Sequence, residues 1–369
     1  MSLKKVEKVK NIALAAVFAG ALACGLLLHP LLPDAVVSYS ERRYYKQFPK
    51  MSASVVLNAS WMGEFETYLL DQFPMRDGLR SVKAGALFYT LCQSDNNGVY
   101  VKDGNIFKMN GSYKEDSVMR FSEKLNTLVD TYFKKASVYV AVIPDKSQYL
   151  RPHAHLQLPY DEMTAVIQAH LHEDIAYIPL KDTLSLQSYY KTDVHWRQES
   201  LMPVVERLSA YMGFSVGKNA YQPHEYAPFY GGYYGQLGLS NITPDTLRYL
   251  SWDGIDEIEV NDIEHPGLTG VYYEKGLAGM DAYDVFLNGA TPVLTLKNSR
   301  CTNGKGLLVF RDSFASSLAP LMIEGYERIT LVDLRYIESS LLEEYVNLRA
   351  DDVLFLYGEL IPNNSDLLK

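Results

Sequence analysis

The sequence predicts an α/β domain with a mostly parallel sheet flanked by helices, preceded by one N-terminal transmembrane helix. Two patterns predict this architecture. An apolar run over residues 12–28 carries no charged side chain. Beyond residue 96, short runs rich in β-branched and aromatic residues alternate with runs of helical period, as βαβ units do. The 369 residues are 47% hydrophobic and 21% charged, which is the composition of a folded globular chain and not of a disordered one.

The N-terminal segment predicts a retained signal-anchor. Residues 1–11 carry four lysines against one acid, Glu7. Residues 12–33 approach the ~20 residues that cross a bilayer core, and basic residues ahead of such a run stay in the cytoplasm. We therefore expect a cytoplasmic basic segment over 1–11, a transmembrane signal-anchor over 12–33, and a C-terminal domain on the outer side of the cell membrane.

Two other interpretations of this segment are a cleaved signal peptide and a lipoprotein signal. A cleaved peptide would use the small residues Ala21 and Ala23, and a lipoprotein signal would use Cys24. Apolar residues continue past Cys24, and Ala21 matches poorly the large aliphatic residue of lipoprotein signals. The uncleaved anchor is the interpretation that we prefer.

Residues 34–95 predict a juxtamembrane helical segment, because aromatic and apolar residues recur there at steps of three and four. The residues that set this period are Trp61, Phe65, Tyr68, Leu69 and Phe73.

Residues 96–369 predict a single α/β domain that opens with a short hairpin, in which Val99–Val101 and Ile106–Phe107 flank a turn. Over about 215–300 helical period is lost, and we expect an irregular insertion of small strands and turns near the active face. The strands are expected at 138–143, 175–178, 306–310, 329–334 and 352–357, and the helices at 115–134, 161–173, 199–212, 316–324 and 339–348.

Charge and cysteine usage limit the classes of ligand. The net charge of −9 and the pI of about 5.4 oppose nucleic-acid binding. No CxxC or Cys/His spacing is present, so no structural zinc and no other cofactor is expected. Cys92 and Cys301 form either one disulfide or two free thiols. The pairs His153-x-His155 and His170-x-His172 are expected at the surface or in structural roles, since residues two apart do not share a helical face.

The first candidate site is Ser313, where the apolar strand Leu307–Phe310 runs directly into a helix of small residues. Ligands of parallel α/β sheets bind where strands end and helices begin. The backbone N–H groups of that helix start could stabilise an oxyanion on an attacked carbonyl. The alternative is that Asp312 or Ser313 merely caps the helix, a common role for both residue types.

The second candidate site is Asp193-x-His195, followed by Trp196. Serine needs a base to take its proton, histidine commonly serves as one, and a carboxylate on its other nitrogen fixes the tautomer. So short a motif recurs by chance. It gains weight only in combination with Ser313.

These motifs resemble those of the DHHW protein family and, through it, the SGNH-hydrolase-like domains of alginate O-acetylation proteins. Asp193, His195 and Trp196 match the D-x-H-W signature, and Asp312-Ser313-Phe314 matches the serine block. Further support comes from residues 72–77 and 97–100. Val194 and Arg311 depart from the family pattern: Val194 stands where the family name has a histidine, and Arg311 where a glycine often precedes the Asp-Ser pair.

The resemblance implies a circularly rearranged SGNH domain, in which the Asp-His pair precedes the nucleophile. Ser313 would be the nucleophile, His195 the general base and Asp193 its orienting partner. Characterised members transfer or remove O-acetyl groups on exported polysaccharides. Arg311 would either crowd the oxyanion site or hold an acidic sugar or carboxylate. Whether a membrane-bound acyltransferase supplies the acetyl group stays open.

Two functions follow as hypotheses. The first is an extracytoplasmic O-acetyltransferase or acetylesterase that acts on a cell-surface polysaccharide through a serine acyl-enzyme. The second is a non-catalytic glycan-binding or scaffold protein of the cell envelope. It is suggested by the tyrosine-rich stretch over 226–234, although tyrosines are also common as half-buried packing residues. The residues expected to contact substrate are Arg311, Trp196, Tyr233 and Tyr234.

Overall fold

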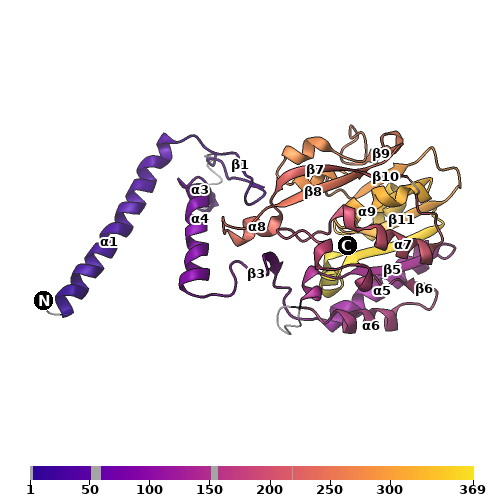
Figure 1. Cartoon of the computed structure of the whole chain (residues 1–369), viewed down its shortest axis with the longest axis horizontal. Helices are drawn as coiled ribbons and strands as arrows, with labels where there is room; N and C mark the ends of the chain where they lie inside the picture. Colours follow the sequence, from indigo (N-terminus) through magenta and orange to yellow (C-terminus); the bar gives the residue numbers. More distant parts are fainter. Residues whose placement is uncertain (1–2, 51–59, 151–156, 218) are drawn as a thin grey trace. The chain divides into compact units, whose positions relative to one another are not determined.

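The computed structural model describes residues 3–50, 60–150, 157–217 and 219–369 of the chain. It divides into two compact units, drawn in Figure 1. The first comprises Met1–Gln93 with Gly238–Ser240, and the second comprises Ser94–Leu237 with Asn241–Lys369.

The first unit begins with α1 (Leu3–Leu28) and a 3₁₀ turn at His29–Leu31. Within the described residues, one helix is long and apolar enough to cross a membrane, over Lys5–Leu31. The α-helix ends where His29 and Pro30 interrupt the apolar run. The prediction of one N-terminal apolar helix is confirmed.

The prediction of helix throughout 34–95 is wrong for residues 34–50. This stretch contains the short strands β1 (Val37–Ser38) and β2 (Arg43–Tyr44), and only then come α3 (Ser60–Asp71), α4 (Arg76–Gly85) and a π-helical turn at Ala86–Thr90. Asp71 of α3 holds this stretch extended, since it accepts a hydrogen bond from the Lys46 backbone N–H at 2.9 Å and pairs with Arg43.

A seven-stranded sheet forms the centre of the second unit (Figure 1). Five neighbouring strands are parallel, and two further strands extend the sheet at one edge through antiparallel pairings. In spatial order the strands are β6 (Ile175–Tyr177), β5 (Ser137–Ile143), β13 (Asp352–Gly358), β11 (Gly306–Arg311), β12 (Arg328–Val332), β10 (Val293–Lys297) and β9 (Glu259–Asp262). The predicted α/β class with a mostly parallel sheet is confirmed.

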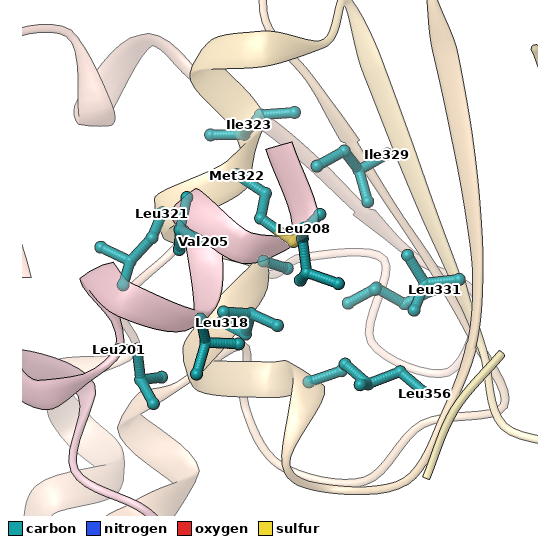
Figure 2. Close-up of a cluster of buried hydrophobic side chains, with 14 of the residues drawn as sticks. Leu201, Val205, Leu208, Leu318, Leu321, Met322, Ile323, Ile329, Leu331 and Leu356 are labelled. Atoms are coloured by element: carbon teal, nitrogen blue, oxygen red, sulfur yellow. The ribbon is translucent and has the colours of Figure 1, made fainter. Parts of the chain in front are cut away.

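Helices cover both faces of this sheet. On one face lie α5 (Glu115–Tyr132) and α6 (Tyr160–His170), and on the other lie α7 (Met202–Met212) and α9 (Ala315–Met322). The side chains of β11 alternate between the two cores, with Leu308 packed toward α5 and Val309 toward α9, as the two-residue period of a strand requires. Figure 2 shows the α7–α9 core, where Leu208 and Leu318 meet Leu331 and Leu356 of the sheet.

Residues 215–300, predicted to form an irregular insertion, also contribute strands to the central sheet. They begin with β7 (Gln222–Phe229), α8 (Gly232–Leu237) and β8 (Asp245–Ser251), and β7 pairs with β8 in a separate ribbon. Their last part supplies β9 and β10, which complete the central sheet. The small hairpin of β3 (Val99–Lys102) and β4 (Asn105–Lys108) is present as predicted. The helix predicted over 339–348 is instead a 3₁₀ turn at Ser339–Leu341 and α10 (Leu342–Tyr345), and it ends before Val346, whose backbone is extended.

Candidate active site

The candidate site lies at the carboxyl edge of the parallel strands. Strand β11 is central in the sheet and ends at Arg311, two residues before Ser313. Neighbouring strands end at the same edge, so the chain brings Asp145 and Lys146 after β5, Asp333 after β12 and Glu359 after β13 to this side of the sheet. This is the edge where ligands of open α/β sheets bind.

Asp312 holds the turn that leads into α9, but it does not cap the helix, because the N-cap position is Phe314 and has no side-chain cap. One carboxylate oxygen accepts a hydrogen bond from the Phe314 N–H at 3.1 Å, and the other accepts one from the Gly358 N–H at 2.7 Å. Burial raises the pKa of Asp312, and these two backbone hydrogen bonds oppose that rise. The Ser313 hydroxyl is left to interact with another group.

That group is His195. The imidazole Nε2 lies 2.8 Å from Ser313 Oγ, although 118 positions separate the two residues in the chain. The other ring nitrogen, Nδ1, lies 2.6 Å from Asp193 Oδ2. Asp193 and His195 are buried, and Ser313 is half-buried. The three predicted residues therefore lie in one hydrogen-bonded row with the geometry that serine nucleophiles require.

A pair of glycines supports the carboxylate of this row. The Gly232 N–H donates to Asp193 Oδ1 at 2.8 Å, and the Gly231 N–H donates to Thr192 Oγ1 at 2.9 Å. A Cβ atom on Gly231 would lie 2.3 Å from the Asp193 Cβ. Only glycine can bring its backbone this close to the Asp193 loop.

Asp245 holds the same loop from a different side. Its carboxylate accepts hydrogen bonds from the Lys191 N–H at 3.0 Å and from the Thr192 N–H at 2.8 Å. The Thr192 hydroxyl donates to it as well, at 2.7 Å, and Arg197 pairs with it at 3.0 Å. Asp245 thereby satisfies backbone donors that would otherwise be buried without partners.

Tyr283 fixes the plane of the His195 ring. The two rings are stacked with 3.8 Å between centroids and 9° between planes. The Tyr283 hydroxyl donates to Ser317 Oγ at 2.8 Å, and Phe314 meets the imidazole edge-on. Tyr283 stands in the irregular segment, and no motif around it indicated a role.

Two residues expected to contact substrate are fully buried, and this expectation needs correction. The Trp196 indole donates to the Phe314 carbonyl at 3.0 Å and to Ser317 Oγ at 2.9 Å, and so ties the His195 loop to α9. Arg311 donates to Ser316 Oγ at 3.1 Å, and burial lowers its pKa. Neither side chain has exposed surface with which to contact a polysaccharide.

The tyrosine-rich stretch divides into buried and exposed rings. Tyr233 is buried, which also corrects its predicted role in substrate contact, whereas Tyr234 is half-buried and Tyr230 is 41% exposed. The Tyr230 and Tyr234 rings lie 4.4 Å apart between centroids. They flank the two glycines that support Asp193, which places an accessible aromatic pair beside the Asp193 loop.

The N–H groups at the start of α9 are mostly engaged. Phe314 donates to Asp312, Ala315 to the Asp312 carbonyl at 3.4 Å and Ser316 to the Ser313 carbonyl at 3.2 Å. Across the described residues, no acceptor is found for the N–H of Ser313 itself. This group is the donor at the helix start that remains for an oxyanion.

Neither His170 nor His172 takes part in this row. His153 and His155 fall outside the described residues. His170 bonds the Val166 carbonyl at 2.8 Å, and His172 lies 3.8 Å from Asp130. Cys24, Cys92 and Cys301 are free thiols.

Neither a protein-family model nor a curated protein sequence matches the chain. Solved structures do match it. A DHHW family protein from Eubacterium siraeum DSM 15702 superposes with a TM-score of 0.59 at 18% identity, over 74% of this chain and 97% of that one. Bacillus cereus PatB1 superposes with a TM-score of 0.59 at 19% identity, over 73% of this chain and 97% of that one. The structure of PatB1 with a sulfonyl adduct superposes with a TM-score of 0.55 at 17% identity, over 72% of this chain and 97% of that one. The protein therefore has the fold of the DHHW family protein and of PatB1, as the resemblance of its motifs predicts.

Proposed function

We propose that the protein is an extracytoplasmic O-acetyltransferase or acetylesterase that acts on a cell-surface polysaccharide through an acetyl-serine intermediate. The observation that carries the proposal is the continuous hydrogen-bonded row from Asp193 through His195 to Ser313. Its motifs resemble those of proteins that move O-acetyl groups on exported polysaccharides. That PatB1 has been solved with a sulfonyl adduct suggests a labelling test, since sulfonyl fluorides react with activated serines.

In the first step Ser313 Oγ attacks the carbonyl carbon of an acetyl ester while His195 Nε2 takes the hydroxyl proton. Asp193 accepts the hydrogen bond of the Nδ1–H, so that it fixes the tautomer and stabilises the imidazolium. Negative charge develops on the carbonyl oxygen, and the Ser313 N–H is the backbone donor for it. His195 then gives its proton to the departing oxygen as the acetyl-serine forms.

The second step decides between transferase and esterase. A sugar hydroxyl or a water molecule attacks the acetyl-serine, and His195 Nε2 takes the proton of the attacking group. Ser313 regains its proton when the acyl bond breaks. A sugar hydroxyl gives net O-acetyl transfer, whereas water gives ester hydrolysis.

The polysaccharide is held by Tyr230 and Tyr234, whose paired rings are accessible beside the Asp193 loop. Such rings offer flat apolar faces to sugars and hydroxyls to solvent. In this proposal α1 spans the bilayer as an uncleaved anchor, and the second unit lies outside the cell membrane. A membrane-bound acyltransferase delivers the acetyl group in the transferase form of the proposal.

The test is hydrolysis of p-nitrophenyl acetate by the detergent-extracted full-length protein. Ser313→Ala should lower kcat by roughly 1,000-fold or more, and a sulfonyl fluoride should label the wild type but not the variant. Ser340→Ala is the matched control, since Ser340 is exposed, and it should retain both properties. Equal rates for the wild type and Ser313→Ala would refute the proposal.

The alternative is a glycan-binding scaffold without chemistry, which the pair of exposed Tyr230 and half-buried Tyr234 favours. A scaffold would retain polysaccharide binding in Ser313→Ala and lose it when both tyrosines are replaced. Binding together with no serine-dependent acetyl release would select this alternative.

A further inference from the structure

Lys146 is a fully buried cation immediately after β5, and it has no part in the proposed acyl chemistry. Its ammonium donates three hydrogen bonds, all to backbone carbonyls of one loop. The acceptors are the carbonyl oxygens of Asp193 at 2.7 Å, Tyr190 at 2.9 Å and Lys191 at 3.1 Å. An ammonium has three donors and no acceptor, so each of its protons is used.

Two aromatic rings complete the surroundings of this ammonium. The Phe107 and Tyr233 centroids lie 5.3 and 5.1 Å from Nζ, distances at which a ring face attracts a cation. Tyr233 therefore serves the loop from inside the fold and not a sugar from outside it.

Lys146 and Asp245 act on complementary backbone groups of the same loop. Lys146 donates hydrogen bonds to the carbonyl oxygens of residues 190, 191 and 193, while the Asp245 carboxylate accepts hydrogen bonds from the N–H groups of residues 191 and 192. The two N–H groups of Gly231 and Gly232 add a third attachment. The Asp193 backbone is thereby fixed on either side of the carboxylate that orients His195.

We propose that Lys146 is a positioning residue of the active site, which holds the Asp193 loop in the geometry that aligns His195 with Ser313 only while its side chain is protonated. This inference rests on the proposed function. A neutral amine has two donors and a lone pair, so one of the three carbonyls would face a lone pair and the loop would lose an attachment. The Asp193 carbonyl has the shortest of these bonds and is the one nearest to the chemistry.

The charges around Lys146 bring this change of protonation into an accessible range. Burial lowers the pKa of Lys146 to about 8, against the opposing attraction of the Asp145, Asp193 and Asp245 carboxylates, and Arg197 lowers it further. We therefore expect kcat of the wild type to fall as the pH rises through about 8, with KM little changed.

Stability should change in the opposite direction over the same range. The folded-state pKa of about 8 lies below the ordinary value of 10.5, so between these values the unfolded chain binds the additional proton. The contribution of Lys146 to the free energy of unfolding therefore increases as the pH rises. In Glu359→Gln, where the titration of Glu359 is removed, a fall in kcat without a fall in stability separates loop positioning from plain unfolding.

The experiment measures p-nitrophenyl acetate hydrolysis against pH for the full-length protein, with the rate of Ser313→Ala subtracted. Lys146→Met should lower kcat by about 100-fold, as a misplaced catalytic group does, and should abolish the alkaline fall. Lys146→Arg keeps a charge at every accessible pH, so it should recover part of kcat and show no alkaline fall. Circular dichroism checks that each variant is folded.

Glu359→Gln is the control, because burial also raises the pKa of Glu359 to about 8. The alkaline fall should persist in this variant. An alkaline fall that persists in Lys146→Met, or disappears in Glu359→Gln, would overturn the assignment to Lys146.

If neither Lys146 variant folds, the wild type alone decides. The His195 Nδ1 proton resonance should broaden over the pH range in which the Lys146 Cε shift titrates, and a sharp resonance throughout would refute the proposal. Equal activity of Ser313→Ala and the wild type would instead refute the proposed function.

Discussion

At the scale of single residues, Gly231 is the position where one added methyl group should do most damage. Its Cβ would lie 2.3 Å from the Asp193 Cβ and 2.4 Å from the Thr192 carbonyl oxygen, and backbone of this loop cannot yield as a flexible side chain can. We expect Gly231→Ala to cost about 1–3 kcal/mol of stability and to lower kcat, as thermal unfolding and p-nitrophenyl acetate kinetics would measure.

Gly267→Ala is the control for this prediction, since nothing lies within 4 Å of the Cβ that it would add. It should leave both Tm and kcat near the wild-type values. If Gly231→Ala were equally silent, the close contact with the Asp193 loop would have no bearing on the site.

The residue types in the sequence predicted the Asp193, His195 and Ser313 row but not the residues that support it. Asp193, His195 and Ser313 could be named because their chemistry is specific to so few side chains and because two motifs carry them. Lys146 and Tyr283 could not, since a lysine and a tyrosine acquire their roles only through what the fold places beside them. The sequence predicts that Arg311 and Trp196 contact substrate because arginine and tryptophan often bind ligands. Only the structure reveals that both side chains are buried.

At the scale of elements, the proposed function assigns sugar binding to Tyr230 in the turn between β7 and α8 and to Tyr234 in α8. Replacing Tyr230 and Tyr234 with alanine should raise KM for an O-acetylated polysaccharide about 10-fold, equivalent to ~1.4 kcal/mol of lost binding. The kcat/KM for p-nitrophenyl acetate should stay unchanged, because that substrate is too small to contact the two tyrosine rings.

Tyr211→Ala provides the comparison for the double variant, since Tyr211 is 46% exposed and lies on α7. It should leave both substrates unaffected. If the double variant lowered turnover of both substrates alike, the tyrosine pair would act on the Asp193 loop and not on the sugar.

Periodicity predicted the parallel strands because each is a short apolar run bounded by turns or helices. It did not predict that residues 259–297 return to the sheet, since β9 and β10 join it through antiparallel pairings and no α-helix lies between them. The extended stretch over 34–50 was missed because the hydrogen bonds of Asp71 that hold it come from a helix further along the chain.

At the scale of the whole molecule, the carboxyl edge of the sheet makes folding stability depend on pH. Glu359 is buried there and accepts hydrogen bonds from the Asp145 N–H at 3.0 Å and from Gln148 at 3.2 Å. Burial, and then the nearby Asp145 carboxylate, raise the pKa of Glu359 from 4.5 to about 8. The stability that this group contributes is fully present below pH 4.5 and is lost as the pH rises through about 8.

Glu359→Gln should remove this loss because the amide stays neutral. Between these two pH values the wild type should lose roughly 4 kcal/mol that the variant keeps, a difference that urea unfolding at several pH values would measure. Glu343→Gln, at an exposed position, should follow the wild type. Parallel curves for the wild type and Glu359→Gln would contradict the prediction.

The attachment of the Asp193 loop by Lys146, Asp245 and the two glycines has a consequence for biogenesis. Those contacts come from chain segments that are far apart in the sequence, so the complete set exists only when the end of β5, the start of β8 and the turn before α8 have all docked. A partly folded chain in which one of these segments is undocked would lack the full support of the Asp193 loop. If the proposed function holds, acyl turnover would reach its full rate only when the last segment has docked, so its onset would report the completion of folding.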